Sequence, residues 1–339
     1  MHFHYLHPFH WREAALCAPA MPLLILAGMA TGHPVEGATA AGAAFAVGFG
    51  AARELGGRRW GAMIAAMLGM SLAAFTGCLL GQSFVLFVLF AGIAAAACAG
   101  AALRDEDLWW VILQVVIAYL IAGYYAGPLV MAAERAVVVL TGGAVQIGIV
   151  AVLARLFPAA AAPTIMPKPP SASQGLRIAH MLRAALCVAA SLVATQRLGL
   201  SNSYWAPMTA LIVLKPRLHE THARGLARLI GTLAGCAVAT AYAHVCIQVA
   251  WGADWLVGIG MAASAMAAYA LQKAHYASLT TAITATVVLL LSLGRAAALA
   301  NAEHRLVATL VGGAMALTIA WIAPHGRRAQ SAGVDRVGA

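Results

Sequence analysis

The sequence predicts an all-α membrane protein, a polytopic helix bundle of about 12 transmembrane helices arranged as two parallel six-helix repeats. Hydrophobic residues make up 63% of the 339 residues and charged residues only 9%, which is too little polar surface to cover a soluble globule. Apolar stretches near the roughly 20 residues that a membrane helix needs recur along the chain from Arg12 to Pro324. Helices are expected because a backbone in lipid must satisfy its own hydrogen bonds.

A fixed offset of 170 positions relates the two halves of the chain. The stretch "AALC" that begins at Ala14 returns at Ala184, and "RAVVVLTGGA" from Arg135 returns as "RLVATLVGGA" from Arg305. This spacing predicts a tandem duplication of one membrane unit. The expected organisation is a first repeat at 1–157, a cytoplasmic linker at 158–174, a second repeat at 175–326 and a cytoplasmic tail at 327–339.

Each expected helix corresponds to one apolar run. In the first half the runs lie near 13–31, 37–51, 60–80, 83–103, 108–126 and 131–157; in the second, near 178–196, 203–216, 229–248, 251–271, 274–293 and 302–323. An even number of spans in each repeat places both termini on one side of the membrane. Arginine and lysine are concentrated in the loops of that side, which makes it the cytoplasmic side under the positive-inside rule.

The second run of each half is short for a membrane span. The run 203–216 has about 14 residues and the run 37–51 about 15 with several glycines, which at 1.5 Å per residue do not cross about 30 Å of hydrocarbon. Short or interrupted helices at equivalent places in two repeats point to the binding site of a transporter. We therefore expect these two segments to face each other around a water-filled pathway.

A polar and aromatic motif begins within the short run 203–216 and continues beyond it. It reads Tyr204-Trp205-x-Pro207-x-Thr209, then Lys215-Pro216, then Glu220-Thr221-x-x-Arg224-x-x-x-Arg228-x-x-Gly231-Thr232-x-x-Gly235. This pattern closely resembles the signature of the FUSC family, which comprises fusaric acid resistance and aromatic acid exporter type proteins. The resemblance implies a bacterial inner-membrane exporter of aromatic carboxylic acids or related hydrophobic anions, driven by the proton gradient.

The same motif supplies the candidate substrate-binding residues, which are Tyr204, Trp205, Pro207, Thr209, Lys215, Arg224 and Arg228. Tyr204 and Trp205 suit stacking on an aromatic substrate, or anchoring at the membrane edge. Arg224 and Arg228 share a helical face and suit capture of one carboxylate, or contact with lipid headgroups.

Pro207 is expected to open or kink its helix, and the hydroxyl of Thr209 to bond either backbone or substrate. The G-x-x-x-G spacing of Gly231 and Gly235 predicts close approach of a neighbouring helix.

Two equivalent pairs near the outer ends of the last helices are candidates for proton coupling: Glu134 with Arg135, and Glu303 with Arg305. Charged residues at membrane depth often mark ion paths. The alternative is that these side chains extend to the interface, where their charge costs little.

Other function classes have little support in the sequence. The chain contains no G-x-x-x-x-G-K-[ST] motif and no convincing acid–base pair or metal cluster, so we expect neither an enzyme nor a bound cofactor or metal. The basic residues are scattered among loops, which argues against nucleic acid as a partner. Expected partners are the substrate anion and membrane lipid, with a periplasmic adaptor or a homo-oligomer as further options. The alternative function is a non-transporting scaffold or subunit of an envelope efflux complex.

Overall fold

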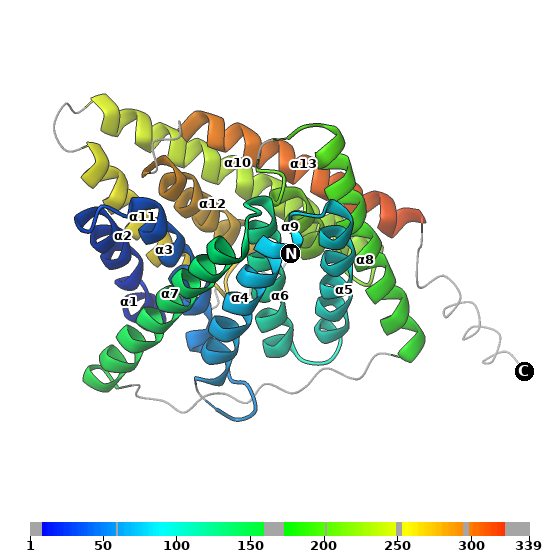
Figure 1. The fold of residues 1–339 in the computed structure, drawn as a ribbon, viewed down its shortest axis with the longest axis horizontal. Helices are drawn as coiled ribbons and strands as arrows, with labels where there is room; N and C mark the ends of the chain where they lie inside the picture. The colour runs from blue at the N-terminus through cyan, green and yellow to red at the C-terminus, as the bar shows by residue number, and fades with distance from the viewer. Residues whose placement is uncertain are drawn as a thin grey trace, which may run out of the picture.

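The computed structural model describes residues 9–58, 60–158, 173–200, 202–248, 253–293 and 298–322. Within these residues the chain is a bundle of helices without β-strands (Figure 1), so the predicted all-α polytopic fold is confirmed. The first half contains α1 (Trp11–Cys17), α2 (Ala20–Ala30), α3 (Pro34–Gly48), the 3₁₀ helix η1 (Phe49–Ala52), α4 (Gly61–Leu80), α5 (Phe84–Ala102), α6 (Glu106–Tyr124) and α7 (Leu129–Leu156). The second half contains α8 (Gln174–Arg197), α9 (Trp205–Val213), α10 (Leu218–Gln248), α11 (Ala253–Ala270), α12 (Tyr276–Leu293) and α13 (Ala298–Ile322).

Ten helical segments of the described chain are long and apolar enough to cross a membrane. The other two of the twelve expected spans correspond to α9 and to α11, whose apolar part is Trp255–Ala270. The first expected span is divided between α1 and α2 near Pro19, which lacks the amide hydrogen that a continuous helix needs. The predicted linker 158–174 lies largely, and the predicted tail 327–339 wholly, outside the described residues.

The two short second spans differ in length. In the second half α9 has only 9 residues, because Leu214 is extended ahead of Pro216 and ends the helix. In the first half the helical segment Pro34–Ala52 has 19 residues, so the expected truncation there is wrong. A turn at Gly32, with φ of 75°, allows the helix to begin at Pro34, earlier than the apolar run indicates.

These two segments do not pack face to face, so that expectation is also wrong. Within the described residues α3 packs mainly on α2 and α7, whereas α9 packs mainly on α13 and α8. The halves instead meet through α5 against α8 and through α1 against α11. Figure 1 shows α5 beside α8 on one flank and α11 beside α1 and α2 on the other. Each second span is thereby held within its own half, and α9 also touches α6 of the first half.

Helices at equivalent positions in the two halves pack on equivalent neighbours. In the first half α4 packs on α6 and α7, and α3 packs on α7; in the second, α10 packs on α12 and α13, and α9 packs on α13. The expected close approach at the G-x-x-x-G spacing is confirmed. A Cβ atom at Gly231 or at Gly235 of α10 would lie 2.5 Å from a carbonyl oxygen of α12, that of Ala277 or Thr281.

Candidate functional site

The turn between α8 and α9 brings the aromatic pair of the motif into the protein interior. Gly199 and Asn202 adopt positive φ angles of 59° and 52°, which reverse the chain after α8. Tyr204 and Trp205 follow with only 4% and 8% of their surface exposed. Pro207 lies in the first turn of α9, where no intrahelical amide bond is lost. The motif therefore starts a short, buried helix at the centre of the second half.

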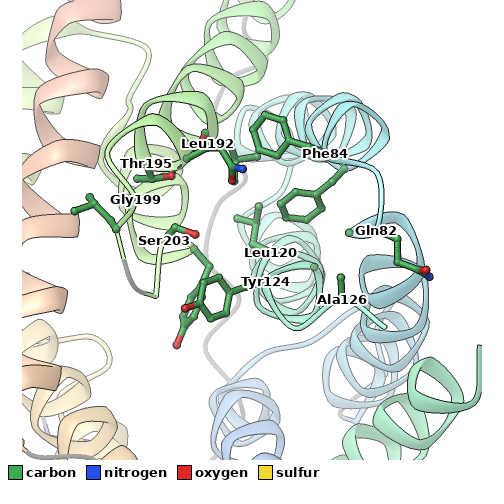
Figure 2. Close-up of a pocket in the computed structure, with 15 residues that line it drawn as sticks. Gln82, Phe84, Leu120, Tyr124, Ala126, Leu192, Thr195, Gly199 and Ser203 are labelled. Carbon is green, nitrogen blue, oxygen red and sulfur yellow. Dashed lines mark hydrogen bonds between the residues drawn. The ribbon is translucent and has the colours of Figure 1, made fainter. Parts of the chain in front are cut away.

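A cavity of about 550 Å³, named the outer cavity after the predicted orientation, lies where the start of α5 and the ends of α6 and α8 meet the start of α9. Figure 2 shows Phe84, Leu120 and Tyr124 of the first half facing Thr195 and Ser203 of the second. Tyr204 also lines it, with its ring centroid 5.3 Å from that of Tyr124. None of the lining residues is charged. The cavity has the volume and the mixed aromatic and polar walls of a small-molecule site.

A second cavity of about 100 Å³ lies at the opposite ends of the same helices. Its wall includes Trp109 of α6, His180 of α8, and Lys215 and Pro216 after α9. The Nζ atom of Lys215 lies 5.1 Å from the centroid of the Trp109 ring. His180 is 3% exposed and its Nδ1 atom is buried without a hydrogen-bond partner in the described structure. This inner cavity, unlike the outer one, is cationic and suits an anionic group.

Hydrogen bonds fix the turn that carries Lys215. The amide of Lys215 donates to the Thr221 hydroxyl at 3.0 Å, and Nη2 of Arg183 donates to the Pro216 carbonyl at 2.9 Å. Burial lowers the pKa of Lys215, and the nearby charge of Arg224 lowers it further. Lys215 is thus a positioned ammonium group that releases its proton more readily than an ordinary lysine.

The two predicted arginines of α10 converge on one phenol. The Arg224 guanidinium lies 3.4 Å from the ring centroid of Tyr276, and Nη1 of Arg228 donates to the Tyr276 hydroxyl at 3.4 Å. Arg228 is 7% exposed, whereas Arg224 is half-buried. The shared helical face inferred from their spacing therefore exists, and its described partner is a tyrosine of α12.

The candidate proton-coupling residues separate into outward and inward groups. Glu134 and Glu303 are exposed, and no ion pair within the described residues joins them to Arg135 or Arg305. Arg135 is half-buried over the ring of Tyr125, at 5.0 Å from its centroid. The structure does not bring these carboxylates and arginines together.

Arg305 instead joins the aromatic pair of the motif. It is 3% exposed, its guanidinium lies 4.0 Å from the Trp205 ring centroid, and its Nε donates to the Thr284 hydroxyl at 3.4 Å. Thr209, 1% exposed, packs beside Gly312 on the same helix as Arg305.

The seven predicted substrate residues therefore do not form a single site. Tyr204, Trp205, Pro207 and Thr209 lie at the start and in the middle of α9, and Lys215 follows its end, while Arg224 and Arg228 lie on α10 against Tyr276. The sequence reasoning missed Trp109, His180 and Tyr276, each of which comes from another helix. The only signal was the presence of His180 within an apolar span, since a polar side chain there needs a reason.

No group of three or more His, Cys, Asp or Glu side chains in the described part of the chain is placed to hold a metal ion. Comparison with curated proteins and with solved structures finds no match. A family model described as "Fusaric acid resistance protein-like" matches residues 184–319, which include α9, α10 and the buried Arg228 and Arg305. The second half of the chain is therefore similar to the FUSC family, and the many apolar helices indicate a multi-pass integral membrane protein.

Proposed function

We propose that this chain is a secondary transporter of the bacterial inner membrane that exports aromatic carboxylic acids or related hydrophobic anions. The observation that carries the proposal is the pair of cavities at opposite ends of one seam, formed by α5 and α6 of the first half and α8 and α9 of the second. Alternating opening of such a seam moves a substrate from one cavity to the other.

The chemistry of the two cavities supports an aromatic anion as the substrate. Lys215 and His180 in the inner cavity offer positive charge and a hydrogen bond to a carboxylate, and Trp109 offers a ring face beside them. Tyr124 and Tyr204 in the outer cavity offer aromatic surface without a fixed charge. A carboxylate is thus held at the inner end and less firmly at the outer end, which favours release outward.

The proposal places both termini in the cytoplasm, so that the cationic inner cavity opens toward the cytoplasmic pool of substrate. It also includes coupling to the proton gradient. Among the described residues that line it, the inner cavity contains one histidine, His180, an imidazole that can carry a proton and that lies beside Lys215. Glu134 and Glu303 are exposed and lie outside both cavities, so His180 is the better placed coupling group.

The equivalent helix pairs of the two halves support a tandem duplication, with the transport pathway between the copies. Under this proposal the second copy carries the substrate chemistry, because Lys215 and the tyrosine-tryptophan pair have no counterparts 170 positions earlier.

The proposal is tested with purified protein in liposomes, using benzoate and hydroxylated benzoates under an imposed pH gradient. We expect flux that a protonophore abolishes, with dependence on the proton gradient lost in His180→Gln. A stable protein that moves none of these acids would refute the exporter and favour the scaffold alternative. Flux that persists unchanged with a protonophore would refute proton coupling alone.

A further inference from the structure

Two arginines lie deep within membrane-crossing helices, on the side of α9 away from the transport seam. Arg228 is ten positions from the start of α10, about 15 Å inside the helix at 1.5 Å per residue, and Arg305 is seven positions from the start of α13 and three from the start of its apolar span Ala302–Ile322. Both belong to helices that are long and apolar enough to span the bilayer, and their exposed fractions are 7% and 3%. A charge at this depth is costly unless something compensates it.

No carboxylate compensates these charges in the described structure. The described neighbours of Arg305 are the Trp205 ring and the Thr284 hydroxyl, and that of Arg228 is the Tyr276 hydroxyl. The described ion pairs include neither arginine. The two guanidinium groups are also near enough for their like charges to interact unfavourably. Two buried cations thus lie within one low-dielectric region, which is unfavourable without a compensating anion.

Hydrogen-bond donors left over at the same place point to a ligand. Nη1 of Arg305, Nε of Arg228 and the hydroxyl of Thr232 are buried without hydrogen-bond partners in the described structure. Thr232 is fully buried on α10, one turn after Arg228 and one turn before Cys236, whose thiol bonds the Ala302 carbonyl of α13. The Thr232 side chain therefore lies on the face of α10 that meets the helix of Arg305. Buried donors of this kind are normally satisfied.

We propose that Arg228, Arg305 and Thr232 bind one small monovalent anion between α10, α12 and α13. The anion neutralises the pair of arginines and accepts the unpartnered donors. It is small because α10 and α12 are in close contact through Gly231 and Gly235 beside it. Its chemistry fits a halide or a single carboxylate group. This site goes beyond the proposed function, since it lies outside both cavities of the seam.

The first half provides matched controls for the two arginines. Arg58 and Arg135 stand 170 positions before Arg228 and Arg305, but Arg58 is exposed and Arg135 is only half-buried. Removing either of them takes away the same charge at the equivalent position without touching the proposed site. Anion effects that arise from surface charge alone change equally in both sets of variants.

The anion site is tested by thermal unfolding of the purified protein in neutral detergent at constant ionic strength. Replacing gluconate by chloride or bromide is expected to raise Tm saturably, by about 3 °C or more. Arg58→Gln and Arg135→Gln should keep this response, whereas Arg305→Gln and Arg228→Gln should lose it. Thr232→Val keeps the side-chain volume and provides a second test in case the arginine variants do not fold. It should raise the half-saturating chloride concentration several-fold.

A second readout uses Trp205, which lies against Arg305. Iodide should quench a saturable part of the tryptophan fluorescence, and this part should vanish in Trp205→Phe. Competition by benzoate would identify the carboxylate of a transported acid as the natural ligand, and its absence would identify a free halide. Unfolding that is the same in chloride and gluconate, or a chloride response unchanged in Arg305→Gln and Thr232→Val, would overturn the site. Halide binding without any acid flux would overturn only the proposed function.

Discussion

Replacement of Lys215 by glutamine tests the inner cavity directly. The side chain is half-buried, lies 5.1 Å from the Trp109 ring and lines a cavity of about 100 Å³. A cavity of this size holds little water, so water cannot take the place of the ammonium group as hydrogen-bond donor to a bound carboxylate. A hydrogen bond to a charged group contributes about 1.5–3 kcal/mol. Since each 1.4 kcal/mol corresponds to a factor of ten, the KM for export should rise roughly 10- to 100-fold.

The assay is uptake of radiolabelled benzoate into inside-out proteoliposomes over a range of concentrations. Lys273→Gln is the matched control, because Lys273 is an exposed lysine in the loop between α11 and α12. Displacement of benzoate by its neutral amide supplies a second control, since an uncharged ligand should bind equally well to the wild type and to Lys215→Gln. An equal loss for both lysine variants, or an equal loss of affinity for the amide, would refute carboxylate capture by Lys215.

Three further predictions follow from the same geometry. Because its pKa is lowered, Lys215 loses its charge at a lower pH than an ordinary lysine, so substrate affinity should fall as pH rises. Lys215→Arg should shift this fall in affinity to higher pH. A pH profile of KM that is the same in this variant and the wild type would contradict the prediction. Gln196→Trp, at the exposed rim of the outer cavity, should lower kcat by about tenfold or more without lowering Tm. Leu198→Trp, exposed outside the cavity, should leave kcat unchanged. Equal flux through both variants would count against the outer cavity as part of the pathway. Gly235→Ala should destabilise the protein by roughly 1–3 kcal/mol in thermal unfolding because its Cβ atom meets α12. Gly258→Ala, with open space around it, should leave the stability unchanged. Equal Tm values for the two variants would refute the close packing.

The sequence predicted the helical fold well because composition and span length depend on local chemistry. The shortness of the second-half span was also visible, since the apolar run 203–216 has only about 14 residues. The equivalent first-half span was misjudged. Its helix begins at Pro34 and continues through a 3₁₀ turn, and the apolar run 37–51 included neither extension.

The site was predictable only in part, because its partners come from distant helices. Tyr204 and Trp205 were identified as candidates from their motif, but Arg305 was predicted to couple protons together with Glu303, or to extend to the interface, and its contact with Trp205 was not foreseen. Periodicity does not say which face of α13 turns inward. The structure separates the exposed Glu303 from the buried Arg305, although they are only two positions apart.

The central claim is that the seam between the halves opens during transport, and a cross-link across it tests this most directly. A Cβ atom at Gly92 of α5 would lie 3.8 Å from the Cβ atom of Ala185 on α8, which is close to the separation in a disulfide. The double variant Gly92→Cys, Ala185→Cys should therefore cross-link under mild oxidation, and each single variant serves as a control for the native cysteines. The account predicts that oxidation stops benzoate flux and that reduction restores it; full flux through the cross-linked protein would contradict the account.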